Sequence, residues 1–173
     1  MNISSVLEFW HLFCGHGLDV CIDGGWAVDA LLGEQTRPHG DLDIALPESQ
    51  VGALRALMAA RGFRQIQWHD SWLHNFVLRR ANGETLDVHS YELKPDGSNL
   101  LGVPYTAAHL SGTGTILGSR VRCIPPEVLV RFHTGYPLDE DDWHDVRLLC
   151  ERFGVQVPDD YAKFRDGESS GAS

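Results

Sequence analysis

Apolar residues recur at helical spacing near the start of the chain, where Leu7, Trp10 and Phe13 fall on one face. Ser5 begins a capping-box pattern, so a helix is predicted over residues 5–14. Comparable spacing, bounded by glycine or proline, predicts further helices at residues 26–32, 51–58, 126–133 and 139–153.

Shorter segments that alternate polar with apolar residues, or that are rich in apolar residues, predict strands. Asn82 and Gly83 form a strong hairpin turn between two of them. The predicted strands cover residues 19–23, 41–46, 63–68, 72–80, 84–91 and 120–124. The glycine-rich residues 101–119 show no clear pattern.

The order of these elements predicts an α+β fold with a mixed sheet, flanking helices and a helical C-terminal part. We place the α/β core at residues 1–124 and the helical part, packed on the core, at residues 125–158. The sequence then turns polar, so residues 159–173 are interpreted as a largely disordered tail, most clearly at 167–173.

The chain has 173 residues, of which 43% are hydrophobic, enough for the core of one domain. Its formal net charge of −10 argues against a nucleic-acid partner and suits a cationic small molecule. No apolar run approaches the roughly 20 residues that span a bilayer, and no secretory signal is recognisable, so we expect a cytoplasmic protein without a membrane partner. The four cysteines are scattered, without a CxxC pair, and are interpreted as free thiols.

Two carboxylates, Asp41 and Asp43, lie two residues apart in a predicted strand and therefore share one face of it. Like charges this close repel unless a cation lies between them, and Mg²⁺ commonly joins carboxylates to substrate phosphates. The pair therefore predicts a magnesium site, with two ions, for a nucleoside triphosphate. An exposed strand with an acidic outer face is the alternative.

Asp87 joins this pair if the strand at residues 84–91 lies beside the strand at residues 41–46. A third carboxylate there could bind the second metal ion or accept the proton of an attacking hydroxyl. His89 shares the face of Asp87 and is a second candidate for the base. A solvated strand face is the simpler explanation of both residues.

Gly24 and Gly25 stand between a predicted strand and a predicted helix. Glycine allows the backbone to approach a ligand, and successive amides at a helix N-terminus bind anions, so the pair predicts a site for phosphates. An ordinary strand-to-helix turn is the alternative. Arg37 could hold phosphate oxygens, and His39 could touch phosphate or orient its loop, whereas a surface position explains Arg37 equally well.

In the C-terminal part, His133 and Tyr136 are candidate contacts for the base, the acceptor or the triphosphate. Asp142 and Asp145 are further candidates, but both are equally explained as acidic residues in the first turns of a helix. His69 and His74 lack the spacing and partners of a zinc site, so zinc is not expected.

Four segments carry a resemblance to a known family: DGGWAVD from residue 23, QTRPHGDLDI from residue 35, LDVH from residue 86 and FHTGYPL from residue 132. They resemble antibiotic nucleotidyltransferases of the DNA polymerase β-like superfamily, in particular the lincosamide nucleotidyltransferases and the related aminoglycoside 2″-adenylyltransferases. The similarity runs from about residue 19 to residue 153, and the two later segments favour the lincosamide branch.

The resemblance implies that Asp41 and Asp43 bind the metal, that Asp87 is the third carboxylate, and that phosphates bind at Gly24 and Gly25. It also implies a polymerase β-like mixed sheet with a helical part that closes the acceptor cleft. The expected reaction is transfer of AMP from ATP to a hydroxyl of a small antibiotic, with a lincosamide as the preferred acceptor. An aminoglycoside acceptor, or a regulatory or antitoxin module without activity, are the alternatives, and a homodimer is left open.

Overall fold

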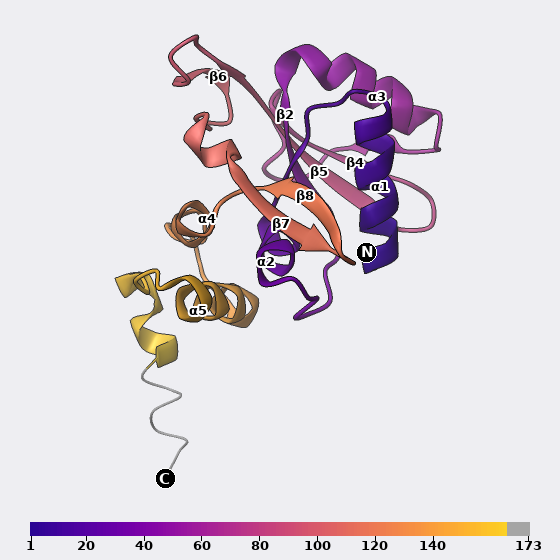
Figure 1. Cartoon of the computed structure of the whole chain (residues 1–173). Helices are drawn as coiled ribbons and strands as arrows, with labels where there is room; N and C mark the ends of the chain where they lie inside the picture. The colour runs from indigo at the N-terminus through magenta and orange to yellow at the C-terminus, as the bar shows by residue number, and fades with distance from the viewer. Residues whose placement is uncertain (166–173) are drawn as a thin grey trace.

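The computed structural model describes residues 1–165 of the chain (Figure 1). Its first helix, α1 (Ile3–Gly15), begins two residues before the predicted start. Asn2 is the N-cap, and its side chain accepts a hydrogen bond from the backbone nitrogen of Ser5. The predicted cap at Ser5 is therefore wrong, because the asparagine at position 2 caps a helix as well as serine does.

A single eight-stranded sheet forms the centre of the molecule. Its main path runs in the order β3-β4-β5-β2-β1-β8-β7, with β6 paired to β5. The pairs β2–β5 and β1–β8 are parallel and the others antiparallel, so the sheet is mixed, as predicted. The strands are β1 (Cys21–Asp23), β2 (Leu42–Pro47), β3 (Arg64–Ile66), β4 (Asn75–Arg79), β5 (Thr85–Leu93), β6 (Asn99–Gly102), β7 (Gly112–Ile116) and β8 (Ser119–Cys123).

The two faces of the sheet differ because side chains alternate along each strand. On one face Leu42 and Ile44 are buried and meet Val6 and Phe13 of α1. The opposite face carries Asp43, one residue from each of those two side chains. Burial of the apolar face thus fixes the register of β2 and turns Asp43 to the other side.

The remaining helices are α2 (Gly24–Leu32), α3 (Val51–Ala59), α4 (Pro126–Phe132) and α5 (Glu140–Phe153). Figure 1 shows α2, α4 and α5 gathered at one end of the molecule, away from α1 and α3. The capping box of α5 is formed by Asp139 and Asp142, which explains the acidic start of that helix. No helix of residues 1–165 combines the length and apolarity that a membrane crossing requires.

Three segments differ from the sequence-based prediction. Helix α2 begins at Gly24, so the double glycine forms its first turn instead of a preceding loop, with Asp23 as N-cap. Residues 101–119, which showed no pattern, contain the end of β6, a 3-10 turn at Ala108–Leu110 and β7. Another 3-10 turn, Asp159–Tyr161, lies in the predicted tail, where the fully buried Tyr161 stacks on Trp143 at 5.7 Å. The predicted disordered end at residues 167–173 lies outside the described residues.

Candidate active site

The register of three neighbouring strands brings carboxylates together. The parallel pairing of β2 with β5 sets Asp43 opposite Asp87, and the antiparallel pairing of β1 with β2 sets Asp23 opposite Asp43. Directly opposite residues have Cβ atoms about 5 Å apart, so these three acidic side chains form a row across the sheet. The pairing of residues 41–46 with residues 84–91 is the one expected from the sequence.

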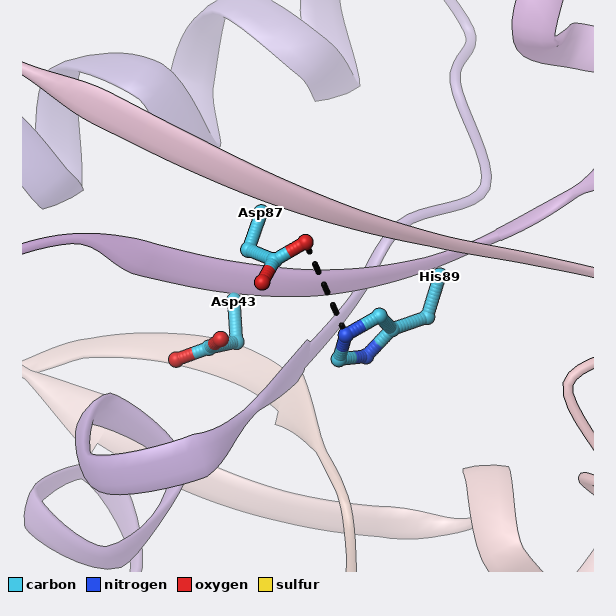
Figure 2. Close-up of side chains that lie close together, drawn as sticks. All are labelled: Asp43, Asp87 and His89. Atoms are coloured by element: carbon cyan, nitrogen blue, oxygen red, sulfur yellow. Dashed lines mark ion pairs between the residues drawn. The ribbon is translucent and has the colours of Figure 1, made fainter. Parts of the chain in front are cut away.

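Asp43, Asp87 and His89 form the centre of the site (Figure 2). One ligand atom of each lies within 4.8 Å of the others. The Nε2 atom of His89 is 3.7 Å from Oδ1 of Asp87. That buried Oδ1 atom has no hydrogen-bond partner within residues 1–165. A buried carboxylate oxygen without a hydrogen bond is costly, which indicates that a further group binds there.

The protein environment disfavours the ionised forms of both strand carboxyls. Burial raises the pKa of Asp43 well above its usual value, the charges of Asp41, Asp87 and Asp23 raise it further, and His89 opposes the increase. Burial also raises the pKa of Asp87, with a contribution from the charge of Asp41. A cation placed between the carboxylates would relieve this repulsion.

His89 supplies positive charge to the row of carboxylates. Burial alone would lower the pKa of this imidazole, but Asp23, Asp43 and Asp87 raise it to about 9. Its Nδ1 atom is 3.0 Å from the hydroxyl of Tyr105, which donates a 2.5 Å hydrogen bond to Asp23. The imidazole is therefore held in a fixed position next to Asp87.

Asp41 lies immediately before β2 and contacts the same site from its end. It is not one of the three residues whose ligand atoms come within 4.8 Å of one another. Its charge nevertheless raises the pKa of both Asp43 and Asp87. The indole nitrogen of Trp26 donates a 2.9 Å hydrogen bond to the backbone oxygen of Asp41, which ties this end of β2 to helix α2.

Each glycine of the pair lies against a different part of the molecule. Gly24 has a φ of 58°, and a Cβ atom there would lie 2.3 Å from Oδ2 of Asp43. A Cβ atom at Gly25 would lie 2.4 Å from Nδ1 of His39 and 2.9 Å from Nη2 of Arg37. Only glycine therefore allows the start of α2 to approach the carboxylates and the preceding loop this closely.

Arg37, a predicted phosphate contact, binds two carboxylates of α5 in the structure. Its Nε and Nη2 atoms donate hydrogen bonds of 2.9 and 2.6 Å to the two oxygens of Asp145. Its Nη1 atom lies 3.3 Å from Asp141. The side chain of Asp145 is fully buried, so this residue is more than an acidic position near the start of a helix.

His39 takes the position expected for a residue that orients its loop. Its Nε2 atom is 2.5 Å from Asp29, and its ring lies 4.6 Å from that of Trp26. Asp29 also accepts hydrogen bonds from the backbone and hydroxyl of Thr36. The sequence analysis missed Asp29, although an aspartate among the apolar residues of a short helix is a signal of a buried polar role.

A cavity of about 450 Å³ opens beside the row of carboxylates, and we call it the large cavity. His133 lines it, whereas Tyr136 does not and instead donates a hydrogen bond to Asp142. Asn75 was missed by sequence reasoning; its buried Oδ1 atom has no hydrogen-bond partner in the part of the chain described. The lining consists of Asp23, Gly24, Asp43, Trp72, Asn75, His89, Val103, Pro104, Tyr105, Phe132 and His133.

A second cavity, of about 210 Å³, contains Asp41 and Asp87, and we call it the small cavity. The two cavities share no lining residue, yet each includes carboxylates of the same site. The donors are hard oxygen atoms from Asp41, Asp43 and Asp87, and one of them is unpaired. These properties fit magnesium, which prefers oxygen ligands and neutralises neighbouring carboxylates.

Comparison with known proteins agrees with this arrangement. Residues 5–149 match the family model of aminoglycoside-2″-adenylyltransferase. A lincosamide resistance protein of Staphylococcus haemolyticus is 31% identical over 140 residues, which are 74% of this chain and 81% of that protein. A 2″-aminoglycoside nucleotidyltransferase of Escherichia coli is 29% identical over 146 residues, 80% of either chain.

The fold also matches a solved structure, that of the lincosamide antibiotic adenylyltransferase LnuA with lincomycin bound. The match has a TM-score of 0.74 at 26% identity and covers 86% of this chain and 96% of the other. Two of these relatives carry the names of enzymes, a nucleotidyltransferase and an adenylyltransferase, which speaks against the alternative of a regulatory or antitoxin module. The chain belongs to the aminoglycoside-2″-adenylyltransferase family and is an antibiotic nucleotidyltransferase.

Proposed function

We propose that the protein transfers AMP from ATP to a hydroxyl group of a lincosamide, with magnesium as the metal. The observation that carries this proposal is the row of carboxylates formed by Asp43 and Asp87, next to a helix N-terminus that begins with two glycines. The similarity to a lincosamide resistance protein and to the lincomycin-bound adenylyltransferase supports the choice of acceptor.

Asp41 and Asp43 are the residues that would hold magnesium. When bound, such ions offset negative charge on the attacking and leaving oxygens of a phosphoryl transfer. The protein supplies the fixed carboxylates, and Gly24 allows the helix to approach Asp43 closely. The backbone amide of Gly25, in the first turn of α2, is the donor offered to the phosphates, since that of Gly24 already donates to Asp23.

Asp87 is assigned the role of general base. The acceptor oxygen forms a bond to the α-phosphorus, the bond from that phosphorus to the oxygen bridging to the β-phosphorus breaks, and pyrophosphate leaves. The hydroxyl proton passes to the carboxylate of Asp87. Burial raises the pKa of Asp87, so this carboxylate holds a proton more readily than an exposed aspartate.

His89 is assigned a positioning and electrostatic role. Its imidazole, with a pKa of about 9, carries positive charge next to Asp87 and Asp43. This charge limits the repulsion among the carboxylates and favours the negative charge of the triphosphate. Tyr105 and Asp23 fix the ring, so His89 can perform this task without reorganisation.

An aminoglycoside acceptor is the second candidate. The name of the matched family and a 29% identical 2″-aminoglycoside nucleotidyltransferase favour it. The formal net charge of −10 also suits a polycationic substrate, which a negative surface attracts. A cytoplasmic location, a homodimer and the preference for ATP over other nucleotides remain predictions.

The test is incubation of the purified protein with ATP, magnesium and either lincomycin or tobramycin, followed by mass spectrometry of the drug. We expect lincomycin to gain the mass of one AMP unit and pyrophosphate to be released in equal amount. Asp41→Asn should abolish both products, while Asp141→Asn, an exposed aspartate at the start of α5, serves as the control. AMP transfer by Asp41→Asn at the wild-type rate would contradict the assignment of this site.

A further inference from the structure

A short segment after α5 packs back onto that helix, and we call residues 158–165 the C-terminal turn. It contains the 3-10 turn Asp159–Tyr161 and lies beyond residue 149, where the match to the family model ends. Figure 1 shows it in yellow beside α5. Its contacts are therefore not among the features that the family model describes.

Three neighbouring aromatic rings hold the C-terminal turn against α5. The ring of Tyr161 lies 5.7 Å from that of Trp143, and the ring of Phe164 lies 6.1 Å from Trp143 and 5.9 Å from Tyr161. Both Tyr161 and Trp143 are buried. Aromatic pairs at these distances are stabilising beyond the apolar area that they bury. The turn therefore has a fixed position, although most of its residues are polar.

The hydroxyl of Tyr161 reaches the loop between α4 and α5. It donates a 2.6 Å hydrogen bond to the backbone oxygen of His133. Burial raises the pKa of Tyr161, and the charge of Asp142 raises it further, so the phenol keeps its proton and remains a donor. At the other end of the same loop, Nζ of Lys163 donates a 3.3 Å hydrogen bond to the backbone oxygen of Leu138. The C-terminal turn thus holds both ends of residues 133–138.

His133, the residue that Tyr161 holds, belongs to the wall of the large cavity. Its Nδ1 atom is 2.8 Å from the backbone oxygen of Leu129, which fixes the imidazole to α4. The lining of this cavity also includes Asp43 and His89, two of the three residues at the centre of the candidate active site. A shift of the loop between α4 and α5 therefore changes the shape of the cavity that contains those side chains.

We propose that Tyr161 is a positioning residue for nucleotidyl transfer, because its hydroxyl fixes His133 and with it one wall of the large cavity. Tyr161 does not line the cavity itself, so it acts through His133 and contacts no reacting group. The inference rests on the proposed transfer of a nucleotide, but not on which drug accepts it. Misplacement by about 1 Å can reduce a rate by about 10²-fold even when the mutated residue is far from the chemistry.

The main test compares Tyr161→Phe with Phe164→Leu in steady-state kinetics of pyrophosphate release with ATP, magnesium and lincomycin. Tyr161→Phe removes only the hydroxyl, whereas Phe164→Leu weakens the ring cluster and leaves the hydroxyl in place. Each variant should lower the midpoint of thermal unfolding by about 2–4 °C, so the rates are compared well below both midpoints.

We expect kcat/KM to fall about tenfold in Tyr161→Phe and less than about twofold in Phe164→Leu. Lys163→Met, which removes the contact at the other end of the loop, should also change kcat/KM by less than about twofold. An equal loss in Tyr161→Phe and Phe164→Leu would mean that the C-terminal turn contributes only stability. That result, or full activity of Tyr161→Phe, would overturn the proposal.

An NMR measurement makes the inference independent of turnover. His133→Gln identifies the ring C–H resonances of His133 in the spectrum of the wild-type protein. These resonances should shift in Tyr161→Phe and keep their positions in Phe164→Leu. If the wild-type protein releases no pyrophosphate, the proposed function fails, and the NMR spectra still decide whether Tyr161 positions His133. Unchanged resonances in Tyr161→Phe, or equal shifts in both variants, would contradict this role.

Discussion

Two groups of aspartates in this molecule have opposite surroundings. Asp43 and Asp87 lie on the sheet face among other carboxylates, and Oδ1 of Asp87 has no hydrogen bond within the described chain. Asp29 and Asp145 are more deeply buried, yet each accepts several hydrogen bonds from the loop that precedes β2. We call Asp29, Thr36, Arg37, His39 and Asp145 the loop network.

The comparison separates carboxylates that are available to bind a ligand from carboxylates that stabilise the fold. A buried carboxylate with full partners stabilises the arrangement around it, whereas a repelling pair with an unpaired oxygen is stabilised when a cation or ligand binds. The two glycines can be assigned in the same way, because Gly24 lies against Asp43 of the candidate active site and Gly25 lies against the loop network. Substitutions in the two groups should therefore affect different quantities.

The largest effect is expected for Asp43→Asn. Loss of this carboxylate should reduce the rate of pyrophosphate release by about 10³-fold, since it removes a charge from the centre of the site. The free energy of unfolding should stay equal or increase, because repulsion with Asp41, Asp87 and Asp23 is relieved. Urea denaturation measures the second quantity, and a clear loss of stability would place Asp43 with the structural aspartates.

Asp145→Asn should have the opposite result, a loss of stability instead of a loss of rate. It leaves the half-buried guanidinium of Arg37 without its buried charged partner, and breaking a buried pair typically destabilises a protein by about 3–5 kcal/mol. Asp141→Asn is the matched control, because Asp141 also pairs with Arg37 but is mostly exposed, and its loss should cost about 0–1 kcal/mol. Equal unfolding midpoints for the two variants would show that the loop network contributes little to stability.

Replacing each of the two glycines with alanine tests the distinction between the site and the loop network with the smallest chemical change. Gly24→Ala forces Asp43 to move, and a displacement of about 1 Å in a catalytic group can reduce the rate about 10²-fold. Gly25→Ala crowds His39 and Arg37, and overpacking of this kind costs about 1–3 kcal/mol of stability. Pyrophosphate release and urea denaturation of both variants give the result, and identical profiles for the two would contradict the comparison.

The same contrast explains what the sequence could reveal. The alternation of Leu42, Asp43 and Ile44 defines the strand and its acidic face. Once the two strands are paired, the position of Asp87 opposite Asp43 can be inferred as well. The partner of Arg37 could not be inferred, because Asp145 is 108 residues away and nothing local links them. A motif arginine next to a phosphate site suggests a phosphate contact, and only the packing of α5 against α2 shows its ion pair.

Residues 101–119 were unassigned for a related reason. Glycines in this region occur where backbones approach closely: a Cβ atom at Gly114 would lie 2.3 Å from the backbone oxygen of Ala30 in α2. Such contacts give no periodic pattern of apolar residues, so strand β7 has no signal in the sequence. Tyr105, which fixes His89 and Asp23, lies in the same region and was missed with it.

Magnesium binding should change the stability of the protein by the smallest amount among these tests. It should also distinguish the two groups of aspartates most clearly. At ten times its Kd, an ion that binds only the folded protein stabilises it by about 1.4 kcal/mol. The wild-type protein and Asp145→Asn should both show this increase in a thermal unfolding experiment, and EDTA should reverse it. Asp43→Asn should not respond, because its change removes a ligand instead of a structural partner. An equal increase in Asp43→Asn would mean that magnesium binds outside the row of carboxylates.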